Sequence, residues 1–153
     1  MDSSTGKESP LTLPTDRLLL DTHVLVWTLE DDARLGTTAR SEIVRARDAD
    51  ILYVSITSLW ELGCLAAKGK IRVPDLRAWW LEAVRRLRAT ELPIGRSVIL
   101  EFFQLEGMHN DPGDRFLVAT ALREKITLVT ADEKILAWCS SHCVEGTALD
   151  ARR

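Results

Sequence analysis

Several features common in other protein classes are missing from this sequence, and each absence excludes a class. No apolar run approaches the roughly 20 residues of a membrane helix, so we expect no membrane segment. The first residues, MDSSTGKESPLTLPTD, contain no apolar core of a secretory signal. Three cysteines, an odd number, do not predict a disulfide framework and favour reduced thiols in the cytoplasm.

Nucleotide-binding and zinc-binding motifs are also absent or incomplete. Neither GxGxxG nor GxxxxGKS/T occurs, which gives little support to a dinucleotide or nucleoside-triphosphate site. Cys139, His142 and Cys143 lie close together, but the chain has no second ligand pair at zinc-finger spacing. The net charge of −3 argues against a protein that coats nucleic acid by charge alone.

The composition is that of an ordinary globular domain. Hydrophobic residues make up 46% and charged residues 28% of the 153 positions. This length predicts one domain, large enough to bury a substantial core. We expect a flexible polar leader over 1–16, followed by a single domain over 17–150.

Short apolar runs alternate with longer segments of helical pattern, which indicates an α/β fold. Buried strands are predicted at 17–21, 51–55, 91–94 and 126–130, with a last edge strand at 143–146. Helices are predicted at 23–32, 37–50, 57–70, 76–88, 97–106, 114–124 and 133–138. Strands alternating with helices at these lengths predict a central parallel sheet covered on both faces.

Acidic residues recur where predicted strands end. Asp21 follows the first strand directly, and Asp132 lies two residues beyond the strand at 126–130. Asp111 and Asp114 stand in the loop before a helix, and Glu61 lies one turn into the helix after the strand at 51–55. Ligands of open α/β sheets bind outside the carboxyl ends of the strands, so these acids are expected to converge.

Converging carboxylates repel one another unless a cation compensates them. Mg²⁺ prefers carboxylate oxygens and retained water, and it promotes hydrolysis of phosphodiesters. Structural roles remain open for four of these acids: Glu61 in a formal capping box begun by Ser58, Asp111 in a turn before Pro112, and Asp114 and Asp132 at helix starts. No capping role is predicted for Asp21.

Neighbouring side chains have simpler interpretations. His23 and His109 each lie two residues from an acid, and we expect structural or bystander roles for both. Arg115 is a candidate ion-pair partner for Asp111 or Asp132. The basic clusters at 68–72 and 85–88 are expected to be mostly solvated helix faces. The adjacent Trp79 and Trp80 are expected by default to pack in the core, with exposure of one of them as the alternative.

Four stretches resemble one known family in order and spacing. They are LLLDTHVLVW (18–27), VSITSLWELGCLAAKGKI (54–71), HNDPGDRFLVATAL (109–122) and LVTADEKIL (128–136). Together they span about 17–138, and the chain resembles the PIN-domain family, in particular the VapC-type toxins. The long leader departs from the family pattern, in which chains commonly start close to the first strand.

The resemblance implies a three-layer α/β/α sandwich and an endoribonuclease that depends on Mg²⁺ or Mn²⁺. It assigns catalysis and metal binding to Asp21, Glu61, Asp114 and Asp132, with Asp111 and Thr130 in supporting roles. It also implies an RNA substrate, a homodimer and an antitoxin protein as partner of the toxin. An exposed tryptophan at 79 or 80 would suit the dimer or antitoxin surface.

Two other functions compete with this one. A HAD-like phosphatase also carries an aspartate at a strand end, but it needs a second acid two residues later, where this chain has His23. A non-catalytic PIN-like module that binds RNA or a partner is the other alternative, and the intact set of four acids argues against it.

Overall fold

The computed structural model describes residues 16–142 and 147–153. The predicted leader, apart from Asp16, and the predicted strand at 143–146 lie outside the described residues. Within the described part, no helix is both long and apolar enough to cross a membrane.

The centre of the fold is a sheet of five parallel strands in the order β3-β2-β1-β4-β5. The strands are β1 (Leu18–Leu20), β2 (Leu52–Ser55), β3 (Thr90–Leu92), β4 (Thr127–Thr130) and β5 (Ala148–Asp150). Every neighbouring pair is parallel, as the sequence predicted. The chain first builds the sheet outward from β1 to β3 and then places β4 on the other side of β1. The topological switch point, where such sheets bind ligands, therefore lies at the carboxyl ends of β1 and β4.

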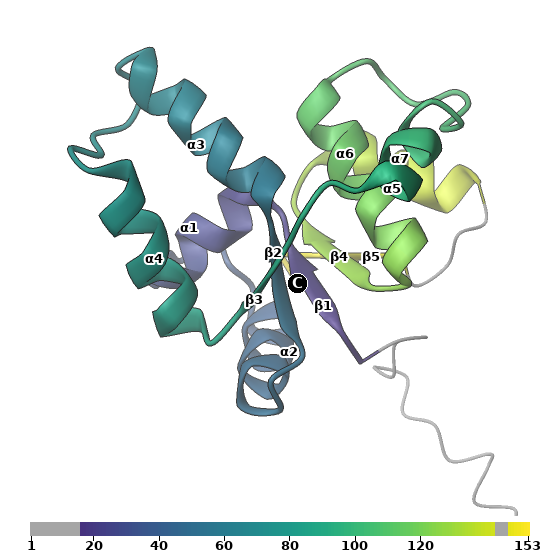
Figure 1. The fold of residues 1–153 in the computed structure, drawn as a ribbon. Helices are drawn as coiled ribbons and strands as arrows, with labels where there is room; N and C mark the ends of the chain where they lie inside the picture. Colours follow the sequence, from purple (N-terminus) through teal and green to yellow (C-terminus); the bar gives the residue numbers. More distant parts are fainter. Residues whose placement is uncertain (1–15, 143–146) are drawn as a thin grey trace, which may run out of the picture.

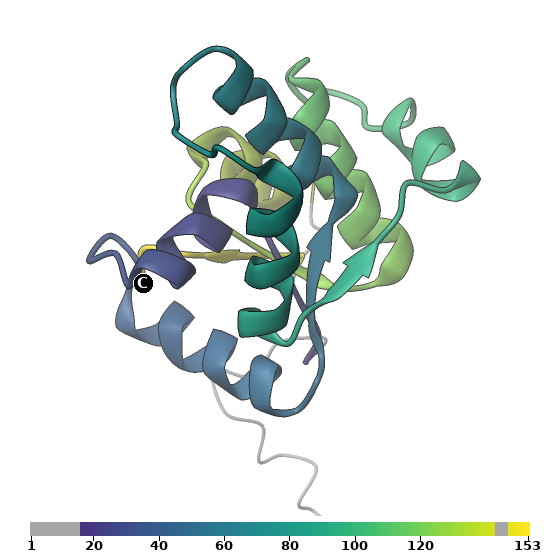
Figure 2. The same ribbon diagram turned by 60° about the vertical axis from the view of Figure 1, so that its left-hand side comes forward.

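Seven helices of the described chain cover the two faces of this sheet. They are α1 (Thr22–Glu30), α2 (Thr37–Asp48), α3 (Ile56–Ala67), α4 (Leu76–Leu87), α5 (Arg96–Phe102), α6 (Pro112–Glu124) and α7 (Glu133–Ser141). Helices α1 to α4 lie on one side and α5 to α7 on the other, as Figure 1 and Figure 2 show. This arrangement confirms the three-layer α/β/α sandwich.

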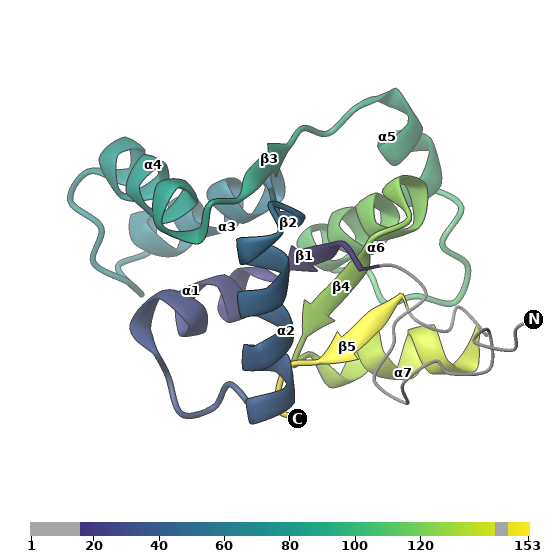
Figure 3. The ribbon, with the colours of Figure 1, turned by 90° about the horizontal axis from the view of Figure 1, so that it is seen from below.

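The side chains of the short central strand β1 show how the two helix layers pack on the sheet. Leu18 and Leu20 are fully buried in the cluster that includes α1 to α4. Leu19 points to the opposite face and is fully buried in the cluster that includes α5 to α7. Successive strand residues alternate between faces, so three leucines anchor two helix layers. Figure 3 shows α2 on one side of the sheet and α6 and α7 on the other, with β5 at the sheet edge.

Several boundaries differ from the predicted ones for local reasons. Strand β3 ends at Leu92 because Pro93 has no N–H for the ladder. Helix α6 begins at Pro112 rather than at residue 114, since proline suits the first helical position. Helix α5 ends at Phe102, four residues early, where Arg115 donates to the carbonyls of Phe102 and Leu105. Helix α7 continues to Ser141, and the fifth described strand is β5, at 148–150.

Candidate active site

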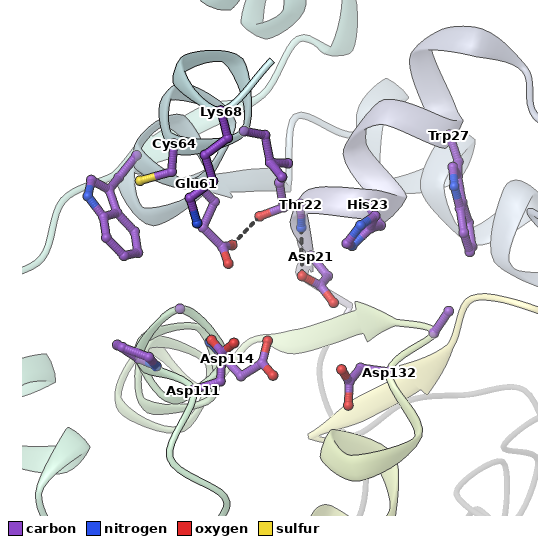
Figure 4. Close-up of a pocket in the computed structure, with 15 residues that line it drawn as sticks. Asp21, Thr22, His23, Trp27, Glu61, Cys64, Lys68, Asp111, Asp114 and Asp132 are labelled. Carbon is purple, nitrogen blue, oxygen red and sulfur yellow. Dashed lines mark hydrogen bonds between the residues drawn. The ribbon is translucent and has the colours of Figure 1, made fainter. Parts of the chain in front are cut away.

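Five acidic side chains line one cavity of about 630 Å³ at the carboxyl ends of the strands. They come from four separate segments: Asp21 from the end of β1, Glu61 from α3, Asp111 and Asp114 from the start of α6, and Asp132 from the loop after β4. Figure 4 shows Glu61 pointing from α3 towards Asp111 and Asp114 at the start of α6, with Asp21 to the right of these groups and Asp132 further right. The structure thus brings together all the acids that the sequence singled out.

Asp21 is the most buried of these acids, at 6% exposure. Its Oδ1 accepts a hydrogen bond of 2.7 Å from the backbone N–H of Thr22, and its Oδ2 accepts one of 2.6 Å from Thr130 Oγ1. Asp21 is the N-cap residue of α1, so the expectation that it has no capping role was wrong. The error arose because α1 begins at Thr22, directly after the strand and its acid.

Thr130 connects the ends of the two central strands. Besides donating to Asp21, its hydroxyl oxygen accepts a 3.0 Å hydrogen bond from the backbone N–H of Asp132. Asp132 in turn caps α7, because its Oδ1 accepts from the N–H of Ile135 at 3.0 Å. The capping role considered for Asp132 is therefore real, and the same side chain also faces the cavity.

Glu61 is held by a pair of buried hydroxyl groups. Thr22 Oγ1 donates to Glu61 Oε1 at 2.5 Å, and Ser58 Oγ lies 2.8 Å from the same Thr22 oxygen. The capping box from Ser58 to Glu61 is not formed, because Ser55 caps α3 by accepting from the N–H of Thr57. Ser58 and Thr22 support Glu61 instead, a role that the sequence analysis missed.

The two aspartates at the N-terminus of α6 have different roles. Asp111 is the N-cap, and its Oδ1 accepts from the N–H of Asp114 at 3.1 Å. Asp114 is therefore not the cap; it lies in the first turn of α6, where the helix dipole favours an anion, and its carboxylate faces the cavity. There Asp114 Oδ2 lies 2.7 Å from Nε2 of His109, a hydrogen bond that brings this histidine to the site.

Gly113 is required by the close approach of α6 to Glu61. A Cβ atom at this buried position would overlap the Glu61 carboxylate group. No other residue type leaves this space open, since glycine alone lacks a Cβ. The glycine between the two aspartates therefore lets carboxylates from α3 and α6 share one cavity.

The electrostatics of the site indicate a missing positive charge. Burial, followed by neighbouring carboxylates, raises the pKa of Glu61 to about 7 and that of Asp114 to about 6. Burial also raises the pKa of Asp21. Within 16–142 and 147–153, no lysine or arginine forms an ion pair with any of the five acids. Among the described residues, these acids therefore have no lysine or arginine ion-pair partner, and His109 is the basic side chain that contacts one of them.

The same donor set fits a divalent cation. Single ligand atoms of Glu61, Asp111 and Asp114 lie within 4.8 Å of one another, and so do those of His109, Asp114 and Asp132. Hard oxygen ligands in this number are the ones that Mg²⁺ and Mn²⁺ bind. A bound cation would also remove the cost of placing several carboxylates together.

Some predicted contacts are not formed. Arg115 makes no ion pair with Asp111 or Asp132; its guanidinium group donates to backbone carbonyls, among them that of Met108 at 3.0 Å. Trp80 is buried in the core cluster and Trp79 packs against it, as the default expectation had it, and the exposed tryptophan is Trp60.

The cysteine-rich segment offers no zinc site in the described part of the chain. Cys139 is buried, and the ring of His142 stacks on Trp138 with 4.4 Å between the ring centroids. Cys143 lies outside the described residues. The groups of potential metal ligands found among the described residues each include acids of the cavity and contain no cysteine.

Comparison with known proteins identifies close parallels. The model of the PIN domain family matches residues 18–138. Ribonuclease VapC22 from Mycobacterium tuberculosis (strain ATCC 25618 / H37Rv) is 32% identical over 122 residues, which cover 77% of this chain and 88% of that protein. The crystal structure of FitAcB from Neisseria gonorrhoeae superposes with a TM-score of 0.53 and 19% identity, over 80% of this chain and 93% of that one. The last match supports the fold alone.

Proposed function

This chain belongs to the PIN-domain family, in its VapC-type branch, and we propose that it is a metal-dependent endoribonuclease. The observation that carries this proposal is the set of five carboxylates in one cavity, without a lysine or arginine of the described chain paired to them. The relative named Ribonuclease VapC22 supports RNA as the substrate.

The proposed metal ligands are Asp21, Glu61, Asp114 and Asp132, with Asp111 and Thr130 in support. Bound Mg²⁺ or Mn²⁺ would neutralise the scissile phosphate and lower the pKa of the attacking water. The hydroxyl groups of Thr22 and Thr130 fix one oxygen each of Glu61 and Asp21. Such outer contacts orient the carboxylates that would bind the metal.

The biological setting that we propose is a toxin–antitoxin pair. Membership in the VapC-type branch supports a protein antitoxin as partner and a homodimer as the functional unit. Light scattering on the purified chain measures the oligomer, and co-expression with the neighbouring open reading frame tests for a bound antitoxin. A monomer that captures no product of that frame would contradict this part of the proposal.

The catalytic proposal is tested with purified protein and fluorescently labelled single-stranded RNA. We expect cleavage that Mg²⁺ or Mn²⁺ stimulates, EDTA stops and Asp21→Asn abolishes. Glu82→Gln, in an exposed ion pair on α4, serves as the matched control and should cleave normally. RNA binding without metal-dependent cleavage would favour the non-catalytic module. A stable aspartyl-phosphate on Asp21 would favour a phosphatase instead.

A further inference from the structure

Trp60 occupies an unusual position for a tryptophan. Its side chain is 55% exposed, whereas Trp27, Trp80 and Trp138 are each at most 9% exposed. Large aromatic side chains normally contribute to folding by burial, and Trp60 is not part of either core cluster. It does, however, line the same cavity as the acids. Folding therefore does not account for this residue, and the cavity does.

Helix α3 lines the cavity with more residues than Glu61 alone. Trp60, Glu61, Cys64, Leu65 and Lys68 all line the cavity, a spacing that follows successive turns of one helix face. In Figure 4, Cys64 and Lys68 continue along α3 from Glu61. At 1.5 Å per residue the wall from Trp60 to Lys68 is about 12 Å long. It joins an aromatic ring, a carboxylate of the acidic cluster and an exposed ammonium group.

We propose that this α3 wall binds the nucleotide of single-stranded RNA that adjoins the scissile phosphate. The indole ring of Trp60 stacks on the base, and the ammonium group of Lys68 pairs with a neighbouring phosphate. The inference rests on the proposed function and specifies its substrate contacts. Exposed aromatic side chains stack on bases of any sequence, and lysines contact the backbone.

The charge of the cavity favours contact with a base over contact with phosphates alone. Five carboxylates repel the phosphates of RNA until a cation is bound, so backbone attraction alone gives little affinity. Stacking on an uncharged ring avoids this repulsion, and Lys68 has no ion-pair partner among the described residues.

A protein partner fits the surroundings of Trp60 less well. Binding hot spots place tryptophan within a packed apolar surface. The other exposed large apolar side chains lie on α2, α4 and α5 and just after α5: Val44, Leu81, Ile99, Leu100 and Phe103. The wall around Trp60 instead carries Glu61, Cys64, Leu65 and Lys68, two of which are charged.

The test measures RNA binding by the full chain with Asp21→Asn in the background, in the presence of Mg²⁺. Anisotropy of a labelled, 2′-O-methylated single-stranded RNA gives Kd without cleavage. Trp60→Ala is expected to weaken binding roughly 5- to 100-fold, and Trp60→Phe to retain most of the affinity. RNA should quench tryptophan fluorescence in the parent protein but much less in Trp60→Phe.

Lys68→Gln should lower the slope of log Kd against log salt by about 0.7, the value for one phosphate contact on a single strand. Phe103→Ala and Lys125→Gln are the matched controls, an exposed aromatic residue just after α5 and an exposed lysine at the far end of α6. Both should bind RNA as the parent does. Circular dichroism should show native folding for every variant, since all four side chains are exposed.

An unchanged Kd for folded Trp60→Ala overturns the inference, and so does a loss that Trp60→Phe fails to restore. Normal RNA binding by Trp60→Ala combined with lost capture of a partner protein assigns the residue to a protein interface instead. Cleavage assays on the wild type distinguish failure of this inference from failure of the proposed function. If wild type and Trp60→Ala cleave limiting RNA equally well, the proposed RNA contact of the α3 wall is wrong and the catalytic proposal stands. If wild type never cleaves RNA, the catalytic proposal fails.

Discussion

Glu61→Gln should stabilise the metal-free protein while it removes activity. The pKa of Glu61 is raised from 4.5 to about 7, so the folded state disfavours its charged form. A shift of this size corresponds to about 3 kcal/mol, and because Glu61 is only partly buried we expect solvent screening to leave about 1 to 2 kcal/mol. Glutamine has nearly the same shape, and its carbonyl oxygen still accepts from Thr22.

The sign of the pH dependence follows from the direction of the shift. Below pH 4.5 the carboxyl group is protonated in both folded and unfolded states, so it carries no penalty. Between pH 4.5 and about 7 the unfolded state ionises while the folded state resists, and wild type loses stability. The advantage of the glutamine variant should therefore be full at pH 8 and mostly absent at pH 5.

Thermal unfolding in EDTA, followed by circular dichroism at both pH values, measures this difference. For a chain of this length, 1 to 2 kcal/mol corresponds to about 2 to 8 °C in Tm. Glu82→Gln is the control, because its ion pair with Arg85 lowers the pKa of Glu82, and this variant should show no gain at pH 8. Mg²⁺ should raise the Tm of wild type more than that of Glu61→Gln. A glutamine variant no more stable than wild type at pH 8 would refute the electrostatic reasoning.

Three further predictions concern the support of the acids. Gly113→Ala should push the Glu61 carboxylate out of the cavity and lower RNA cleavage about 10- to 100-fold in kinetic assays. Its Tm should change little, because the flexible Glu61 side chain can move away from the added methyl group. Thr22→Val should weaken Mg²⁺ binding by about 10- to 100-fold in titration calorimetry, and Thr22→Ser should restore it; equal affinities would disprove the role of the hydroxyl. Asp132→Asn should keep the cap of α7 and lose activity, whereas Asp132→Ala should also lose about 1 kcal/mol in denaturant unfolding; equal stability would show that the cap is unimportant.

The sequence was sufficient for strands β1 to β4, though not for β5, and for the meeting of the acids. Buried strands are short apolar runs, and the carboxyl ends of parallel strands share one edge of the sheet. Asp21 and Asp132 could therefore be assigned to the same region although 110 positions separate them. The family resemblance then indicated which acids belong to one set, and the family comparison confirmed that resemblance.

The contacts that orient Glu61 were not predictable, because they depend on how helices pack. Thr22 meets Ser58 and Glu61 only when α1 lies against α3, across 36 and 39 positions of sequence. Arg115 was expected to pair with an acid, but it binds carbonyl groups at the end of α5, which closes that helix early. A single sequence shows that Arg115 can donate hydrogen bonds, but it does not show which acceptors lie next to it in the folded chain.

Structural and functional roles of the aspartates, treated as alternatives at the level of sequence, coexist in the folded chain. Asp21, Asp111 and Asp132 each cap a helix with one carboxylate oxygen, and each also lines the cavity. A cap fixes the side chain at a helix N-terminus, where the positive end of the helix dipole favours an anion. Three helices thus direct their N-termini at one cavity and hold its acids in place. Burial nevertheless raises the pKa values of Asp21, Glu61 and Asp114, and neighbouring carboxylates add to the rise. A cation in the cavity would favour the charged forms of these groups, which is the physical reason to expect one there.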